Sequence, residues 1–229
     1  MTPAVLLLFD IDGTLLIRAS EAHRDAIHDG LRETFGVADP AAVRVEAAGR
    51  TDSAIARGIL EALSADAGFD AEHDRFRAAC VAAYERRCPP TLETYVAPGM
   101  AELLDGLSGA RPSLVTGNYE PIARLKLARA GLGHHFAAGQ GGFGSDAEDR
   151  ALLPEIARRR AGSGGVPHPR DRTIVIGDTP RDIACARADG VRVFAVATGP
   201  FPAAALGAAD AVFDDAWALR DRLASELAI

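Results

Sequence analysis

The sequence has few cysteines, a single lysine and no excess of positive charge. Its three cysteines, Cys80, Cys88 and Cys185, form neither a CxxC pair nor a Cys/His spacing typical of a metal site. An odd number of such thiols fits a reduced, cytoplasmic protein better than a disulfide framework. The formal net charge of −7 argues against a nucleic acid or an anionic membrane as partner, because both require a basic face.

Long apolar runs are also absent. The N-terminus has no basic stretch followed by the apolar segment of a signal peptide, and no segment approaches the length of about 18 apolar residues that a membrane helix needs. We therefore expect a cytoplasmic protein, either a monomer or a homodimer. With 229 residues, 48% hydrophobic and 25% charged, the chain is long and apolar enough for one core domain with an insert.

The segment Leu6–Leu15, with the sequence LLLFDIDGTL, organises the rest of the chain. Its apolar start is typical of a strand buried on both faces of a parallel sheet. The run ends in Asp10 and Asp12, whose side chains share a face if the strand geometry continues. Two anions about 4 Å apart repel by roughly 4 kcal/mol at an effective dielectric constant near 20. Such a pair requires a cation, a shared proton or a catalytic role.

A helical insert follows this strand. The apolar periodicity predicts helices over 21–35, 51–63 and 71–87, and Pro89 and Pro90 end the last of them. Between about residues 17 and 91 the sequence contains no convincing strand. We expect residues 17–91 to form a helical cap domain, and residues 1–16 and 92–229 to form the core domain.

The rest of the chain alternates between strand and helix patterns. The expected helices are 100–107, 120–130, 147–160, a segment that ends at 188, and 217–227, and the expected strands are 112–115, 136–139, 173–177, 191–197 and 210–213. The glycine-rich segment 139–146 is expected to be a loop, because it fits neither the phosphate-binding P-loop nor the dinucleotide fingerprint. His134 and His135 are adjacent and are expected to point apart, which argues against a metal pair. The pattern predicts an α/β protein, a Rossmann-like parallel-sheet core with an inserted all-α cap.

Three short motifs lie where such a sheet binds its ligands, at the carboxyl ends of its strands. Residues 10–14 (DIDGT) resemble the DxDGT motif of the haloacid dehalogenase superfamily, residues 115–117 (VTG) its second motif, and residues 177–182 (GDTPRD) its fourth, GDxxxD. The helical insert resembles the cap that many members carry between the first two motifs. The chain is thus similar, over most of its length, to the superfamily's phosphohydrolases and in particular to its phosphoglycolate-phosphatase-like enzymes.

The resemblance implies a catalytic mechanism and a metal. Asp10 would be the nucleophile that forms an aspartyl-phosphate, and Asp12 the acid and base that serves the leaving group and then water. Mg²⁺ would be held by Asp10, the backbone carbonyl of Asp12 and Asp178, since this ion prefers oxygen ligands. Asp182 would be either an outer ligand or a partner that orients the metal's waters. Thr116, with the amides of Gly117 and Asn118 at a helix N-terminus, would bind the phosphate.

The sequence departs from the superfamily at its third motif, a basic residue that is usually lysine. Arg150 stands at the matching position. Lys126, the only lysine of the chain, is the alternative, because it lies about two helical turns, roughly 9 Å, after Thr116 and its side chain leans back toward the helix N-terminus. Arg50 lies where related caps present a specificity loop, and would pair with a carboxylate or a second phosphate of the substrate; Arg18 is a weaker candidate.

These motifs predict a magnesium-dependent phosphatase that acts on a small phosphorylated metabolite. A sugar-phosphate mutase of the same fold remains open. Asp12 argues against a haloacid dehalogenase, which lacks the second aspartate, and the absence of lysine from residues 17–91 argues against a phosphonate hydrolase. A non-catalytic binding module is disfavoured by the complete set of acids, although motifs show capacity rather than use.

Overall fold

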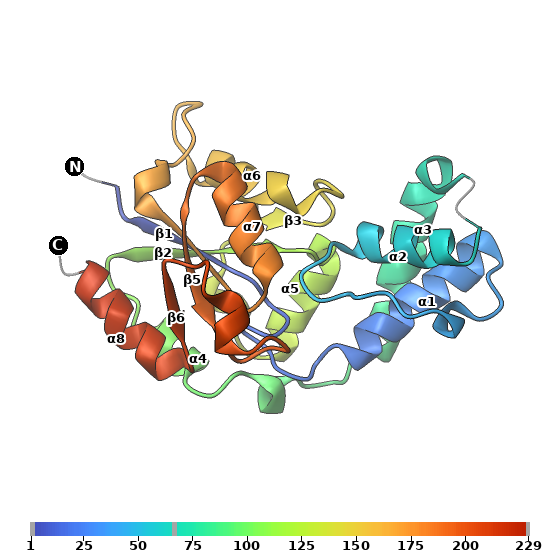
Figure 1. Ribbon diagram of the computed structural model, residues 1–229, viewed down its shortest axis with the longest axis horizontal. Coiled ribbons are helices and arrows are strands. Elements are labelled where there is room, and N and C mark those ends of the chain that lie inside the picture. Colours follow the sequence, from blue (N-terminus) through green and yellow to red (C-terminus); the bar gives the residue numbers. More distant parts are fainter. Residues whose placement is uncertain (1–2, 66–67, 228–229) are drawn as a thin grey trace.

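A computed structural model of the chain describes residues 3–65 and 68–227. Its centre is a six-stranded parallel sheet with the strand order β3-β2-β1-β4-β5-β6 (Figure 1). The strands are β1 (Val5–Phe9), β2 (Ala110–Thr116), β3 (Gly142–Phe143), β4 (Thr173–Gly177), β5 (Arg192–Val196) and β6 (Ala211–Phe213). The predicted α/β class and parallel sheet are confirmed. Of the predicted core, residues 1, 2, 228 and 229 lie outside the described residues.

Strand β1 is buried on both faces, as its apolar run predicts. Leu6 and Leu8 belong to the apolar cluster that helices α6 (Leu153–Ala161) and α7 (Pro180–Asp189) cover. Leu7 and Phe9 belong to the opposite cluster, which α4 (Met100–Asp105), α5 (Glu120–Arg129) and α8 (Ala216–Leu227) cover. The sheet is therefore the middle layer of three. Burial of its leucines, worth about 1.5–3 kcal/mol for each side chain, fixes the strand between the helical layers.

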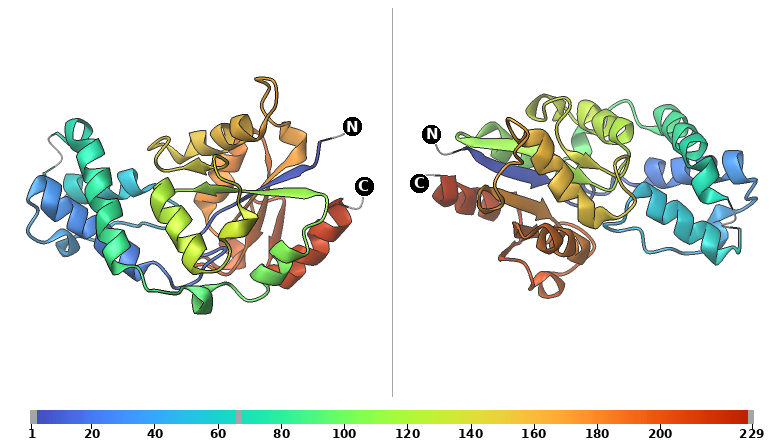
Figure 2. Two further views of the ribbon diagram at one scale, coloured as in Figure 1. Left: turned by 180° about the vertical axis from the view of Figure 1, so that it is seen from behind. Right: turned by 90° about the horizontal axis from the view of Figure 1, so that it is seen from above.

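Residues 17–91, called the cap segment below, contain helices α1 (Glu21–Phe35), α2 (Asp52–Ala62) and α3 (Phe69–Arg87), close to the predicted ranges. These helices pack on one another beyond the carboxyl ends of the strands, away from the layered part (Figures 1 and 2). Phe76 fills their centre, where Gly30 makes room for its ring: a Cβ at Gly30 would lie 2.9 Å from a Phe76 ring carbon. Phe35 and Phe69 stack with ring centroids 5.8 Å apart.

Two predicted elements are wrong. The third strand is not 136–139 but β3, inside the glycine-rich segment expected to be a loop; residues 137–140 form a turn instead, in which the Gln140 amide donates to the carbonyl of Ala137. Gly142 can pair with Val115 there because it has no side chain. A Cβ at this position would overlap the backbone of Leu153. The helix expected over 147–160 begins only at Leu153, after a 3₁₀ turn (Arg150–Leu152) in which the Ala151 amide donates to the side chain of Asp149.

No helix in the described part of the chain is both long and apolar enough to cross a membrane. The parallel order places the carboxyl ends of β1, β2 and β4 side by side, with β1 between the other two. Asp10 follows β1, Thr116 ends β2 and Asp178 follows β4. The three motifs therefore converge at one edge of the sheet, facing the cap segment.

Candidate active site

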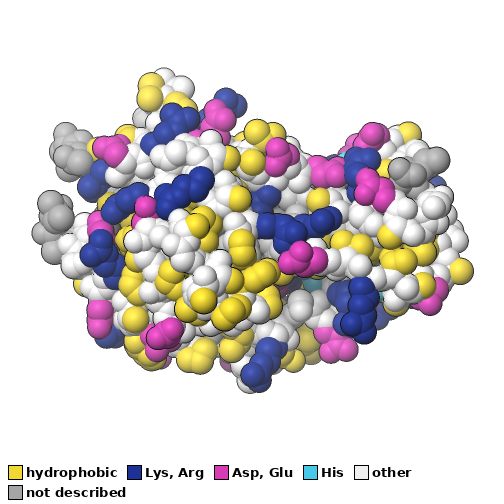
Figure 3. All heavy atoms as spheres, in the orientation of Figure 1, with side chains coloured by type: hydrophobic (Ala, Val, Ile, Leu, Met, Phe, Trp, Pro, Cys, Tyr) yellow, Lys and Arg dark blue, Asp and Glu magenta, His cyan; other side chains and the backbone are white. Residues whose placement is uncertain are grey.

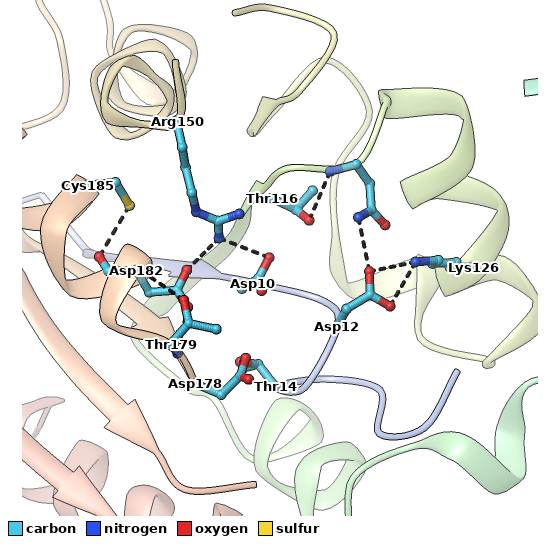
Figure 4. Close-up of polar contacts among 11 residues, drawn as sticks. Asp10, Asp12, Thr14, Thr116, Lys126, Arg150, Asp178, Thr179, Asp182 and Cys185 are labelled. Atoms are coloured by element: carbon cyan, nitrogen blue, oxygen red, sulfur yellow. Dashed lines mark hydrogen bonds and ion pairs between the residues drawn. The ribbon is translucent and has the colours of Figure 1, made fainter. Parts of the chain in front are cut away.

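The first motif continues β1 and then turns sharply. The Asp10 amide donates to the carbonyl of Ile176 at 2.9 Å, which extends the pairing with β4 by one residue. Gly13 then takes a left-handed backbone conformation, φ +92°, and a Cβ at this position would overlap the carboxylate of Asp178. Glycine is required here for both reasons. The turn places Asp10 and Asp12 on either side of the space in front of β1 (Figure 4).

Three buried carboxylates meet at this point. Asp10, Asp178 and Asp182 each offer an oxygen atom, and these atoms lie within 4.8 Å of one another. Burial, together with the neighbouring carboxylates, raises the pKa of Asp10 to about 6 and that of Asp178 to about 8. Arg150 acts in the opposite direction on both residues but does not cancel the effect. Without a further cation, the cluster therefore retains protons that these acids would lose in water.

The cluster fits a metal ion of the magnesium type. One oxygen of Asp178 accepts the hydroxyl of Thr14 at 2.9 Å, whereas its buried Oδ2 has no hydrogen-bond partner among the described residues. A buried carboxylate oxygen without a partner is costly, and a cation would remove that cost. The donors are carboxylate oxygens, the ligand type that Mg²⁺ prefers.

Asp182 differs from the other two acids because both of its oxygens are already occupied. Its Oδ2 accepts the amide and the hydroxyl of Thr179 at 2.9 and 2.7 Å, a reciprocal capping box that starts α7. Its Oδ1 pairs with Arg150. Both oxygens of Asp182 thus have protein partners, and its role, an outer ligand or a partner that orients the metal's waters, stays a prediction.

The two basic candidates for the third motif contact different carboxylates. The buried Arg150 lies between Asp182 and Asp10, with 3.2 Å from its Nη2 to the Asp10 Oδ1. The fully buried Lys126 instead contacts both oxygens of Asp12, at 2.8 and 2.6 Å (Figure 4). Although burial opposes it, the contact with Lys126 and a hydrogen bond from Asn118 hold the pKa of Asp12 below its usual value.

The second motif forms the wall opposite the acids. Thr116 is buried at the end of β2, and its hydroxyl accepts the Asn118 amide at 3.4 Å. The Asn118 side chain donates to Asp12 at 3.0 Å. Gly117 allows the cap segment to approach: a Cβ there would overlap the carbonyl of Arg50, and the Gly117 carbonyl accepts the Asp52 amide at 2.9 Å.

A cavity of about 550 Å³ lies between these motifs and the cap segment. Eight of the ten predicted site residues line it: Asp10, Asp12, Arg50, Thr116, Gly117, Asn118, Arg150 and Asp178. Lys126 and Asp182 lie outside the lining, behind Asp12 and Arg150. The cap segment adds Arg18, Ile27 and Ile55 to the wall. Within the described residues, neither Arg18 nor Arg50 pairs with a carboxylate of the protein.

The sequence did not identify three polar residues of the site. Thr14 belongs to a motif that was recognised, but its bond to Asp178 requires the fold. His23 and Asp52 come from the cap helices α1 and α2, where a buried histidine and a helix-starting aspartate have ordinary structural explanations. One prediction outside the site is also wrong: His134 and His135 do not point apart, since their ring centroids are 3.9 Å apart.

Comparison with known proteins agrees with the architecture and the motifs. Residues 7–187 match the family of haloacid dehalogenase-like hydrolases. The phosphoglycolate phosphatase of Rhodospirillum rubrum is 31% identical over 223 residues, covering 95% of this chain and 90% of that protein. The phosphoglycolate phosphatase of Mesorhizobium japonicum is 29% identical over 201 residues, covering 85% and 83%. A solved structure, a predicted phosphoglycolate phosphatase from Haemophilus somnus, has the same fold, with a TM-score of 0.66, 20% identity and 99% of both chains covered.

The fold and the carboxylate cluster define a hydrolase with a Rossmann-like core. The chain belongs to the haloacid dehalogenase-like hydrolases. The enzyme class predicted from the three motifs, a phosphatase of this family, is thereby confirmed.

Proposed function

We propose that this enzyme is a Mg²⁺-dependent phosphatase that hydrolyses a small phosphorylated metabolite through an aspartyl-phosphate on Asp10. One observation carries the proposal. Asp10 and Asp178 follow different strands, yet their buried carboxylates meet at the cavity beside Arg150, and one oxygen of Asp178 has no hydrogen-bond partner in the part of the chain that the structure describes. The group chemistry also suits phosphoryl transfer, which needs a nucleophile, charge neutralisation and a proton donor for the leaving group.

In the first step, an Asp10 oxygen attacks phosphorus while the bond to the leaving oxygen breaks. Asp12 gives its proton to that oxygen, so the alcohol leaves neutral. In the second step, water attacks the phosphorus of the aspartyl-phosphate, Asp12 takes the water's proton, and Asp10 and inorganic phosphate are released. A Mg²⁺ ion held by Asp10 and Asp178 would neutralise the charge on the transferred group.

The charge state of Asp12 suits both steps. The contact with Lys126 favours the carboxylate, which is the form that accepts a proton from water. A bound phosphate dianion brings negative charge close to Asp12, and a like charge raises the pKa of a carboxyl group. The substrate itself therefore promotes the protonated form that the first step requires.

Arg150 and the second motif bind the phosphoryl group in this proposal. Arg150 neutralises both the nucleophile and the transferred phosphate, the task of the third motif. Thr116 and the amides of Gly117 and Asn118 bind the phosphate oxygens at the start of α5. Asp182, which lies outside the cavity lining, orients Arg150 and would orient the waters of the metal.

The cap segment is a separate domain in this proposal, and it excludes water while recognising the rest of the substrate. Basic side chains gather where it meets the layered core on the face shown in Figure 3. Arg50 and Arg18, unpaired within the described chain, would bind a second anionic group of the substrate. Because two relatives are phosphoglycolate phosphatases, a phosphate ester that also carries a carboxylate is the first substrate to test. The three free, buried cysteines suit the reducing cytoplasm.

The experiment measures phosphate release from p-nitrophenyl phosphate and from a panel of metabolites that includes phosphoglycolate, with and without Mg²⁺. Wild-type protein should be active only with the metal, and Asp10→Asn should abolish turnover while leaving the thermal unfolding midpoint near that of wild type. Full turnover by Asp10→Asn would refute the aspartyl-phosphate mechanism. Conversion of a sugar phosphate to its isomer without net phosphate release would identify a mutase instead.

A further inference from the structure

A chain of buried hydrogen bonds continues from Asp12 into the cap segment. The Lys126 Nζ, which is fully buried, has three acceptors: the two Asp12 oxygens at 2.8 and 2.6 Å and the His23 Nδ1 at 3.1 Å. The His23 Nε2 lies 3.1 Å from the Asp52 Oδ2, which also accepts the Tyr119 amide at 2.7 Å. Every member of the chain of bonds thus has a partner on each side.

The donors and acceptors fix the proton positions in this chain. An ammonium group has three protons and no acceptor, so the Nδ1 of His23 must accept from Lys126. The single ring proton of neutral His23 is then on Nε2, where it donates to the carboxylate of Asp52. The three ammonium protons match the three acceptors in number. Loss of His23 would therefore leave one buried ammonium donor without a partner, which costs more than an ordinary hydrogen bond contributes.

The residues of this chain of hydrogen bonds come from both parts of the protein. Asp12 and Lys126 belong to the layered core, whereas His23 and Asp52 belong to α1 and α2 of the cap segment. Tyr119, which closes the chain, immediately precedes α5, the helix that carries Lys126. The ring of Tyr84 from α3 packs edge-on against His23, with ring centroids 5.5 Å apart. This chain of hydrogen bonds is complete only while the cap segment contacts the core in this position.

Resting on the phosphatase function proposed above, we propose that His23 and Asp52 are positioning residues for Asp12. Through Lys126 they hold the carboxyl group of Asp12 in the orientation that delivers its proton to the leaving oxygen. Proton delivery by Asp12 is then coupled to the seating of the cap segment. Neither residue reaches Asp10, so the attack on phosphorus itself does not depend on them.

The leaving group separates this role from a purely structural one. p-Nitrophenolate leaves as a stable anion and needs little proton donation, whereas an alkoxide such as glycolate's needs a proton as the P–O bond breaks. The value of kcat/KM covers the steps up to formation of the aspartyl-phosphate, so it reports on this proton and not on the later attack by water. We therefore compare kcat/KM for p-nitrophenyl phosphate with kcat/KM for phosphoglycolate, or for the best alkyl phosphate of the metabolite panel.

His23→Leu removes the acceptor for Lys126 while retaining a side chain of similar bulk. We expect it to lower kcat/KM at least about tenfold more for the alkyl phosphate than for p-nitrophenyl phosphate. His23→Asn keeps an acceptor near the Nδ1 position and should recover most of the loss. Asp52→Asn should show the same selective loss, to a smaller extent, and tests the inference even if His23→Leu does not fold. Ser53→Ala is the matched control, since it removes the cap segment's hydroxyl contacts with the Tyr119 hydroxyl and with His73 but leaves the Tyr119 amide, the group that Asp52 accepts, in place.

The outcomes separate this inference from the proposed function. A wild-type protein that releases phosphate from neither ester would refute the phosphatase function, and the positioning role with it. An active wild type whose His23 and Asp52 variants lose both substrates by the same factor, as expected for structural damage, would refute only the positioning role. Equal effects of Ser53→Ala and His23→Leu on the substrate ratio would refute it too.

Discussion

Replacing Arg150 by methionine removes the one cation among the described residues that contacts the proposed nucleophile, and it should impair the enzyme on every substrate. The Nη2 of Arg150 lies 3.2 Å from Asp10, and unit charges at that distance attract by about 5 kcal/mol at an effective dielectric constant near 20. Desolvation of a buried guanidinium offsets part of this attraction. The net contribution of a hydrogen bond to a charged group is about 1.5–3 kcal/mol. We therefore expect kcat/KM to fall by roughly tenfold to a hundredfold.

The assay is Mg²⁺-dependent release of p-nitrophenol and of phosphate from an alkyl phosphate. Because Arg150 would stabilise the transferred phosphoryl group, Arg150→Met should lower kcat/KM for both esters by the same factor. Lys126→Met is the matched comparison. Its ammonium touches Asp12 and not Asp10, so its removal should affect the alkyl phosphate more strongly. Arg150→Lys retains the charge without the planar fork and should lie between wild type and Arg150→Met.

Arg150→Met also predicts a stability change with a defined sign. Without the guanidinium, the pKa of Asp10 rises above its present value of about 6. A carboxyl group whose pKa is raised by folding stabilises the protein at low pH, and this stability is lost as the pH rises toward the folded-state pKa. The metal-free variant should therefore lose more thermal stability relative to wild type at pH 8 than at pH 5. Activity within about threefold of wild type, together with an unchanged pH dependence of unfolding, would refute the assignment of Arg150 to the third motif.

Three further outcomes test the metal site and the seating of the cap segment. The metal-free pKa values of Asp10 and Asp178 are about 6 and about 8, so Mg²⁺ should bind more tightly at pH 8 than at pH 6 and should release protons on binding. Calorimetry in buffers of different ionisation enthalpy measures this proton release. Binding that does not depend on pH would contradict this site. Gly13→Ala places a methyl group against Asp178 and should reduce both Mg²⁺ affinity and turnover at least about tenfold, unlike Gly109→Ala, whose added methyl meets no neighbour. Arg57→Ala removes a partly exposed ion pair, 2.7 Å long, with Glu148 of the core. The free energy of unfolding should therefore fall by no more than about 1 kcal/mol, whereas KM should rise. An unchanged KM would contradict a role of this pair in holding the cap segment on the core.

The sequence predicted those parts of the site that depend on sheet topology. A run of apolar residues can be recognised as a doubly buried strand, and parallel strands present their carboxyl ends at one edge. The approach of Asp178 to Asp10 follows from these two facts, although the two residues are 168 positions apart in the sequence. The helices α1 to α3 were predicted nearly to their ends, because each carries an apolar stripe with the period of a helix.

The sequence could not predict features that depend on contacts between elements. β3 is two residues long and glycine-containing, and it exists because its backbone pairs with β2, not because of local propensity. The start of α6 is set by the side chain of Asp149, which caps a 3₁₀ turn first. His134 and His135 were expected to point apart because they are adjacent in the sequence, but they lie in a 3₁₀ turn, where neighbouring side chains can stack.

The choice between Arg150 and Lys126 shows most clearly where sequence reasoning ends. Helix geometry gave the reach of Lys126 and the general direction of its side chain but not the carboxylate that it contacts, and both residues were left as candidates for one task. In the structure, Arg150 and Lys126 contact different carboxylates. The planar fork of Arg150 lies between the two acids Asp10 and Asp182, whereas the compact ammonium of Lys126 has three acceptors, the two oxygens of Asp12 and the Nδ1 of His23. A guanidinium is too large and too planar for that second position, and an ammonium lacks the spread of donors for the first. The one lysine among the 25 lysines and arginines thus stands where a compact ammonium is needed, and its third acceptor, His23, comes from the cap segment, so that movement of the cap segment away from the core would remove it.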